Sequence, residues 1–433
     1  MDVLARAAAQ AGVPGFAGAT AADCALDALP GGMSNRLFVL RRRTGAGAGA
    51  GTGAGAAVVC RLAFAAGLPP GSCALDQAAV LRALSAPQLA LAPRALGAAA
   101  TPLGALRLEE FLDGATASSA QFRQPRFARA VGRVLGRLHG AADVAEAFAS
   151  AGGGDGDVTI GARLASCARL AAATDDAGAG AGAGGNAASA VAWDAEAAWV
   201  EAEEERAAEA ARGLLPARAT LAHSDAQPGN FLVQSDGGDG GAPPSLRLVD
   251  YEYTVVARSL ARGAGFDLGN AFCEYAIDYS VAEAPGFSLA QGGAGEPPLA
   301  WQRSLLGAWA SASGVVAAEG EGEDNTVGDA AAAGEDDGGD RLGLREASLA
   351  RQFRNERLRA AARCARAGAL HSCLFWAAWA RIIAARPRAA AAASAPSDGL
   401  PPTGHSVFDF GAYSRARFAQ FSRLKASALA SRP

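Results

Sequence analysis

The chain has almost no lysine: Lys425 is the only one among 39 basic residues. Arginine and alanine are used so heavily that the composition is biased, and an arginine at a candidate site is therefore weaker evidence than usual. Acidic and basic residues nearly balance, with a formal net charge of -4. That balance provides no basic face, so we expect no nucleic acid partner.

Paired cysteine motifs and long uninterrupted apolar runs are also missing. The seven cysteines are scattered and form no CxxC motif, which is typical of buried thiols in a reducing compartment. The apolar segment 366–385 is interrupted by His371 and Arg381, so it predicts a core helix and no transmembrane segment. The start of the chain lacks a secretory pattern. We expect a cytoplasmic protein, with organellar targeting left open.

The 433 residues, half of them hydrophobic, are enough for a large core in two lobes. Segments rich in Gly and Ala, or in acidic residues, are predicted to be loop insertions. The segment near 44–56 contains the letters of a GxGxxG fingerprint. No strand leads through it into a helix, so a dinucleotide site is not predicted. These segments lie near 44–56, 175–190, 317–341 and 387–403.

The most informative motif is HSDAQPGN, followed by DYEY after a Gly-rich gap. Asp225 could orient or take the proton of an attacking hydroxyl, and Asn230 and Asp250 offer hard oxygen ligands to Mg²⁺. Each of these residues alone is typical of a turn or a strand end. The ordered set, with His223 before it, favours phosphoryl transfer.

Two short apolar strands are predicted around the gap, at 231–233 and 246–249. In an antiparallel pair, Asn230 and Asp250 would lie at the same end of the hairpin. Neighbouring strands are about 5 Å apart, so both side chains could reach one cation.

Two further polar residues are predicted to be structural. A lone His223 is more typical of a hydrogen-bond partner that fixes the loop than of a base. Asp267, within GFDLGN, is interpreted as a buried carboxylate that pins the catalytic loop and not as a metal ligand.

Together these motifs resemble the choline and ethanolamine kinases, relatives of the aminoglycoside phosphotransferases with a protein-kinase-like fold. The resemblance implies an α+β bilobal fold: a small N-terminal antiparallel-sheet lobe over residues 1–113 and a larger, mainly helical C-terminal lobe over 114–433. It covers most of the chain from about residue 30. The matching blocks are GGMSNRLF (31–38), VVCRL (58–62), LEEFLDG (108–114), HSDAQPGN (223–230), DYEY (250–253), GFDLGNAFCEYAIDYS (265–280), FWAAW (375–379) and FDFGAYSRARF (408–418).

On the nucleotide side, the resemblance implies a glycine loop, a basic strand and an adenine-facing hinge. Arg61 would supply the positive charge for the phosphates, and Asp76 could hold it from a helix. The alternative for Asp76 is a carboxylate that caps a helix start. The remaining implied nucleotide residues are Gly31, Gly32, Ser34 and Asn35 in the loop, and Glu109, Phe111 and Leu112 in the hinge.

On the acceptor side, Trp376 and Trp379 are three residues apart and share a helix face. Aromatic faces attract a cation that lacks N–H donors. Ordinary core packing is the alternative. The resemblance adds Tyr279 and Tyr413 as further walls, with Phe410 a weaker candidate. It also places Gln227 and Glu274 near the acceptor alcohol, with Asp278 as additional negative charge.

The resemblance thus implies a Mg²⁺-dependent enzyme that transfers phosphate from ATP to choline, the first step of phosphatidylcholine synthesis by the CDP-choline route. Ethanolamine, or both amines, remains open as the substrate, and a homodimer is allowed. Alternatives are a kinase for another small alcohol and a catalytically silent kinase fold that binds partners through the acidic segment 319–340. Two departures from the family pattern are Ser224, where Asn is usual, and the long stretch 254–265.

Overall fold

The computed structural model describes residues 1–29, 35–43, 56–63, 75–151, 160–179, 191–234, 244–289, 297–316, 355–385, 400 and 408–430. Gly31, Gly32 and Ser34 fall outside these residues, as do most of the predicted insertions. The predicted loop near 175–190 is wrong at its start, because residues up to Ala179 continue a helix. Leu400, inside the fourth predicted insertion, is buried against the N-terminal lobe.

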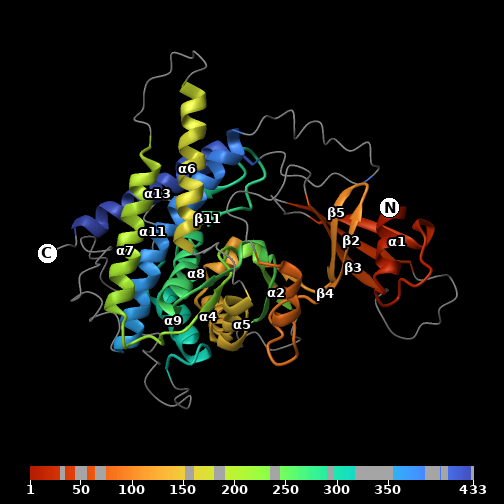
Figure 1. Cartoon of the computed structure of the whole chain (residues 1–433), viewed down its shortest axis with the longest axis horizontal. Helices are drawn as coiled ribbons and strands as arrows, with labels where there is room; N and C mark the ends of the chain where they lie inside the picture. The colour runs from red at the N-terminus through yellow and green to blue at the C-terminus, as the bar shows by residue number, and fades with distance from the viewer. Residues whose placement is uncertain are drawn as a thin grey trace.

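The N-terminal lobe is an antiparallel sheet backed by a helix (Figure 1). Alternate residues of β2 and β3, such as Phe38 and Val58, point into one apolar cluster with Leu4 of α1, as expected for a half-covered sheet. The sheet order is β1-β2-β3-β5-β4. The elements are α1 (Asp2–Gln10), η1 (Ala21–Asp23), β1 (Cys24–Ala28), β2 (Asn35–Arg42), β3 (Ala57–Ala63), β4 (Ala95–Thr101) and β5 (Gly104–Glu110).

The C-terminal lobe is mainly helical, so the predicted α+β bilobal class is confirmed. Helix α2 packs beside the sheet, and β5 leads into the helical lobe through a short connection. The boundary at 113 stays a prediction. The helices are α2 (Gln77–Leu84), α3 (Ser119–Phe122), α4 (Pro125–Gly140), α5 (Ala142–Ala151), α6 (Ile160–Ala179), α7 (Trp193–Ala210), α8 (Leu260–Glu274), α9 (Leu299–Ala312), α11 (Glu356–Ala385) and α13 (Phe410–Ala430).

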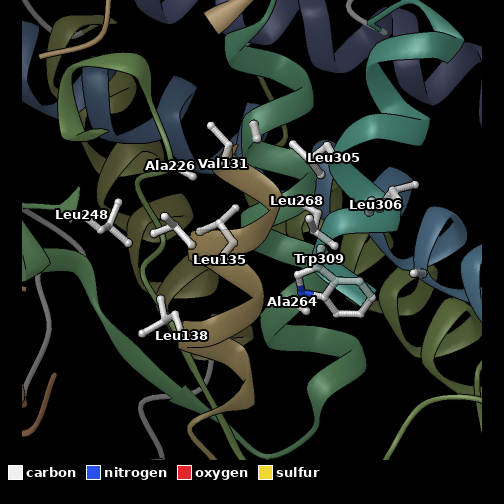
Figure 2. Packing of buried hydrophobic residues seen from close by; sticks show 14 of the residues in the cluster. Val131, Leu135, Leu138, Ala226, Leu248, Ala264, Leu268, Leu305, Leu306 and Trp309 are labelled. Carbon is white, nitrogen blue, oxygen red and sulfur yellow. The ribbon is translucent and has the colours of Figure 1, made fainter. Parts of the chain in front are cut away.

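The main core lies between α4, α8 and α9 (Figure 2). Val131, Leu135 and Leu138 recur on one face of α4 at the spacing that predicts an amphipathic helix. Figure 2 shows Val131 close to Leu305 of α9, whereas Leu138 lies on the side of α4 away from Trp309. This core supports the elements that carry the candidate site.

Helices α8 and α11 approach so closely that glycine is required between them. A side chain at Gly269 or Gly368 would collide with backbone atoms of the partner helix. Helix α11 is long and apolar enough to span a membrane by composition, but 78% of its most apolar window is buried inside the protein. It is therefore packed as the core helix that the sequence predicts.

In the described part of the chain, three small sheets lie around the segments of the candidate site. The predicted hairpin is confirmed with one-residue differences: β8 (Phe231–Gln234) pairs with β9 (Ser245–Leu248), and Phe231 lies opposite Leu248. β6 (Ala115–Thr116) joins the edge of β8. The long stretch 254–265 forms β10 (Val255–Ala257), which pairs with β7 (Thr220–Ala222), and then begins α8. β11 (Ile277–Asp278) pairs with β12 (Ser288–Leu289).

Candidate active site

Asp225 and Asn230 are brought together by the loop between β7 and β8. The Asn230 amide nitrogen donates to Asp225 Oδ2 at 2.7 Å and to the Asp225 carbonyl at 2.8 Å. A single turn of 3-10 helix, η2 (Pro228–Asn230), directs Asn230 back towards Asp225. Because the amide nitrogen faces Asp225, the amide oxygen is the atom that Asn230 can offer to a cation.

Asp267 of α8 holds this loop from beneath. Its two carboxylate oxygens each accept a backbone N–H at 2.7 Å, from His223 and from Ser224. Asp267 is fully buried and also accepts from His139 Nε2 at 2.9 Å. The contacts are those of the loop-pinning role predicted for Asp267.

His139 on α4 was not singled out from the sequence, where it is one histidine in an amphipathic helix. Its Nδ1 accepts from the Trp309 indole N–H at 2.9 Å. Since an indole can only donate, Nδ1 carries no proton and Nε2 is the donor to Asp267. The relay therefore ties α9, α4 and α8 to the catalytic loop through a neutral histidine.

His223 joins the two halves of the hairpin end. Its Nε2 donates to the Val249 carbonyl at 3.0 Å, and its Nδ1 accepts the Asp225 N–H at 3.3 Å. Burial lowers the pKa of His223, which favours the neutral ring that this pattern requires. These contacts fix the loop, in keeping with the interpretation made from the sequence.

Two residues of the site have a left-handed backbone conformation. Ser224 has φ of +68° and Asp250 has φ of +66°, values that non-glycine residues seldom adopt. Asn tolerates this region better than Ser does. Asp250 is separated from the end of β9 by Val249 alone, whose N–H donates to the Asn230 carbonyl at 3.0 Å, so Asp250 lies at the same hairpin end as Asn230.

Carboxylates are concentrated around Asp225. Burial, then Glu274 and Asp250, raise the pKa of Asp225 well above its ordinary value, while the Asn230 hydrogen bond lowers it. Glu252 contributes in the same direction as the other carboxylates. A raised pKa brings an aspartate closer to the range of an effective general base.

The oxygen donors fit a magnesium ion. Mg²⁺ prefers a few carboxylate or amide oxygens together with water and nucleotide phosphates. Asn230 Oδ1 and the Asp250 carboxylate meet that requirement at one hairpin end. Within the described residues no group of three His, Cys, Asp or Glu side chains could hold a metal ion by itself.

Arg61 on β3 lies between carboxylates of both lobes. Its Nη1 is 2.9 Å from Asp250 Oδ1 and its Nε is 3.3 Å from Glu109 Oε1. Burial alone would lower the pKa of Arg61, but Asp250, Glu109 and Glu252 raise it above its ordinary value. Arg61 is thus a permanently charged group beside the proposed metal ligands.

The expected Arg61 to Asp76 pair is wrong. Asp76 caps the N-terminus of α2, accepting from the Ala78 N–H at 2.9 Å, and its side chain is 65% exposed. The role is taken by Glu109, which belongs to the strand beside β3 and also accepts from Arg107 at 2.6 Å. An Asp is too short to reach Arg61 from a helix start, whereas a neighbouring strand is close.

The remaining nucleotide-side residues are placed as follows. Asn35, at the start of β2, donates to Glu252 Oε2 at 2.7 Å, a second contact between the lobes. Phe111 follows β5, and its ring lies 4.4 Å from the Arg41 guanidinium. Leu112 is half-buried in the same connection. The hinge role of Glu109 to Leu112 stays a prediction.

On the acceptor side, Glu274 at the end of α8 binds within the protein through both oxygens. Oε1 accepts from Arg417 at 2.8 Å, and Oε2 accepts from the Tyr279 hydroxyl at 2.7 Å. The Tyr279 and Tyr413 hydroxyls are 3.1 Å apart. Burial raises the pKa of Glu274, while Arg417 and Tyr279 lower it. Asp278 lies apart from this group and bonds to Ser280 and Arg123.

Trp376 and Trp379 are buried and stack edge to face, with ring centroids 5.4 Å apart. Phe410 packs against Trp379 at 5.8 Å, and Tyr253 against Trp376 at 5.1 Å. The Trp376 indole N–H has no hydrogen-bond partner among the described residues. The substrate-binding role of the two tryptophans stays a prediction. Gln227 lies half-buried over Gly229.

Glu252, Tyr253 and Arg417 are site residues that were not chosen from the sequence. The first two lie within the quoted DYEY block, between Asp250 and β10, so their position in the motif was the available signal. Arg417 lies within the SRARF segment, where the general abundance of arginine concealed it.

A family model described as choline/ethanolamine kinase matches residues 26–422. The chain belongs to the choline/ethanolamine kinase family. A human choline/ethanolamine kinase is 40% identical over 70 residues, and mouse choline kinase alpha is 38% identical over 65 residues. The matched segment spans only 16% and 13% of the lengths of these two relatives.

Solved kinases of this family share the fold. A choline kinase from Cryptosporidium parvum aligns with a TM-score of 0.62 over 99% of this chain and 96% of that chain, at 17% identity. A Plasmodium vivax ethanolamine kinase aligns with a TM-score of 0.54 over 94% of this chain and 85% of that chain, at 14% identity. At these identities the likeness establishes the fold alone. One of the two solved proteins is named as a choline kinase and the other as an ethanolamine kinase.

Proposed function

We propose that the protein transfers the γ-phosphate of ATP to the hydroxyl of choline, giving phosphocholine for phosphatidylcholine synthesis in the cytoplasm. The observation that carries this proposal is the contact of Asp225 with Asn230 beside Asp250, braced by Asp267. Phosphoryl transfer needs positioning and charge stabilisation more than covalent chemistry. This loop supplies both.

In the proposed reaction, Asp225 orients the acceptor hydroxyl and accepts its proton as the bond to phosphorus forms. Asn230 and Asp250 would hold Mg²⁺, which when bound neutralises the charge on the nucleotide phosphates. Arg61 would bind the same phosphates, together with the glycine loop at Gly31, Gly32, Ser34 and Asn35.

The charge of the site supports a cationic substrate. Asp225, Asp250, Glu252 and Glu274 influence one another electrostatically, and the guanidinium groups of Arg61 and Arg417 contact only some of them. The carboxylates remain in excess over the arginines. Such a region attracts a small cation and Mg²⁺.

Choline is favoured over ethanolamine because of the aromatic groups near this charge. The rings of Trp376, Trp379, Tyr253 and Tyr413 belong to one cluster. Ring faces bind a quaternary ammonium without hydrogen bonds. Ethanolamine, whose ammonium has N–H donors, is proposed as a second and weaker substrate.

The deciding experiment is Mg²⁺-dependent ADP release with choline, ethanolamine, an aminoglycoside and a simple alcohol. We expect turnover with choline first and ethanolamine second. Release that is independent of every acceptor, or present only with the aminoglycoside, would refute the proposal. No release with any acceptor would instead favour a silent kinase fold.

Replacing Trp379 by Ala tests the aromatic contribution within the same assay. The ratio of kcat/KM for choline to that for ethanolamine should fall by about tenfold, because a desolvated cation–π contact contributes roughly 1–2 kcal/mol. Trp301, buried in the main core with its indole N–H bound to the Phe122 carbonyl, is the matched control whose substitution should leave this ratio unchanged. Equal losses for both amines in Trp379→Ala would argue against the aromatic site.

A further inference from the structure

The hydrogen bonds around Glu274 have a fixed direction. A carboxylate can only accept, so Arg417 and the Tyr279 hydroxyl both donate to it. Because the Tyr279 proton is used in this way, the contact between the two tyrosine hydroxyls is donated by Tyr413. Glu274 therefore orders the two tyrosines and has one firm contact at each oxygen.

Arg417 is held rigidly at the junction of three helices. It is fully buried on α13, and its Nη2 donates to Ser372 Oγ of α11 at 2.9 Å. Ser372 donates in turn to Asn270 Oδ1 of α8 at 2.6 Å. Burying a guanidinium is unfavourable unless it is paired, and apolar residues would stabilise this junction as well. Stability therefore does not by itself explain a buried arginine here, and the contact of Arg417 with Glu274 suggests a second role.

We propose that Arg417 is a positioning residue that determines which amine the site prefers. By neutralising Glu274 and holding one of its oxygens, it removes the best acceptor for the N–H groups of a primary ammonium and leaves binding to the aromatic rings. This inference rests on the proposed function and assigns its selectivity to a residue that touches neither substrate nor nucleotide.

The two amines differ in what they lose at such a site. A primary ammonium carries three N–H donors, and each donor removed from water needs an acceptor. A quaternary ammonium has none, so an occupied Glu274 does not penalise it. Removing the guanidinium would free Oε1 and leave Glu274 without its counter-charge. The negative charge attracts both cations, but only ethanolamine also gains a hydrogen bond, so ethanolamine is helped more than choline.

The test compares Arg417→Met with Arg417→Lys, using purified full-length protein, Mg²⁺ and ATP. In Arg417→Met we expect the choline to ethanolamine ratio of kcat/KM to fall by about tenfold or more, the scale of a hydrogen bond to a charged group. The change should lie in KM, since the transferred phosphate is untouched. Arg417→Lys retains the charge and should keep a ratio near that of the wild type.

Arg415, exposed on the same helix, is the matched control, and Arg415→Met should leave the ratio unchanged. The double variant Glu274→Gln/Arg417→Met replaces the charged carboxylate that Arg417→Met exposes with a neutral amide, which is a weaker acceptor for an ammonium, so its ratio should return towards that of the wild type. A shift that persists in the double variant would overturn the proposal. So would an equal fall for both amines in Arg417→Met.

Should Arg417→Met fail to fold, Ser372→Ala gives the answer. It removes the second anchor of the guanidinium together with the hydrogen bond from Ser372 to Asn270, and leaves the contact of Arg417 with Glu274 in place. The ratio should shift in the same direction by a smaller factor. An unchanged ratio in a folded Ser372→Ala protein would overturn the assignment. Failure of the proposed function itself would be distinct, because the wild type would then phosphorylate neither amine.

Discussion

The loop that carries Asp225 is braced from within the helical lobe, whereas Arg61 and Asn35 of the sheet lobe each contact a carboxylate of the opposite lobe, Asp250 and Glu252. Asp267, His139 and His223 form complete hydrogen bonds without any ligand. The acceptor side is thus ordered before substrate arrives. On the proposed function, the nucleotide side instead makes contacts that phosphates and Mg²⁺ would have to replace.

This difference implies different energetic roles for the two sides. A group that is already in place does not need to reorganise during the reaction, so its removal should mainly lower kcat. A group exchanged between protein and nucleotide should mainly affect binding. The predictions below test that division.

Asp225→Asn should produce the largest effect, a fall in kcat of about 10²–10⁴-fold with little change in KM for ATP. The amide keeps the size of the side chain but cannot accept the hydroxyl proton. Steady-state kinetics with varied ATP and choline will measure this. Near-normal kcat would show that Asp225 is not the base.

Asp225→Asn should become more stable relative to the wild type as the pH rises. The folded-state pKa of Asp225 is raised, so the ionised form opposes folding progressively above the ordinary pKa of 3.8 and through the raised value. The amide does not titrate. Urea unfolding at a series of pH values should show Asp225→Asn overtaking the wild type in this interval, and a constant difference would contradict the burial of charge.

Asp267→Asn should destabilise the protein by about 3–5 kcal/mol, because a buried carboxylate that accepts from three donors is replaced by a group that itself donates. Turnover should fall with the loss of the loop geometry. Asp27→Asn on the exposed edge strand is the control, with a change within about 0.5 kcal/mol. A similarly small effect at Asp267 would mean that the loop does not depend on this anchor.

Arg61→Met tests the exchangeable side. Loss of a charged phosphate contact should raise KM for ATP by about 10–100-fold and leave KM for choline nearly unchanged. Asp250 would lose its partner at the same time, so Mg²⁺ dependence should be measured in parallel. Equal increases in KM for both substrates would indicate that the two sides are not separable.

The sequence predicted those parts of the site that depend on neighbours in the chain. The β8 and β9 hairpin places Asn230 near Asp250 because strand pairing is local, and Trp376 and Trp379 meet because they are three residues apart on α11. The partner of Arg61 depends instead on how β5 lies beside β3. Arg417, Ser372 and Asn270 come from three helices, so no spacing in the sequence indicates their network.

Ser224→Asn should give the smallest effect, a gain in stability of about 0.5–1 kcal/mol, because Asn tolerates the left-handed backbone at φ of +68° better than Ser. The Ser224 hydroxyl makes a long hydrogen bond to the Ala222 carbonyl, at 3.5 Å. Ser224→Ala keeps the strain and is the control, expected to be no more stable than the wild type. If thermal unfolding shows Asn and Ala alike, strain in this loop does not contribute to its energetics. Unchanged kcat in both variants would place Ser224 outside the chemistry, which is expected if the backbone N–H bound by Asp267, and not the side chain, positions Asp225.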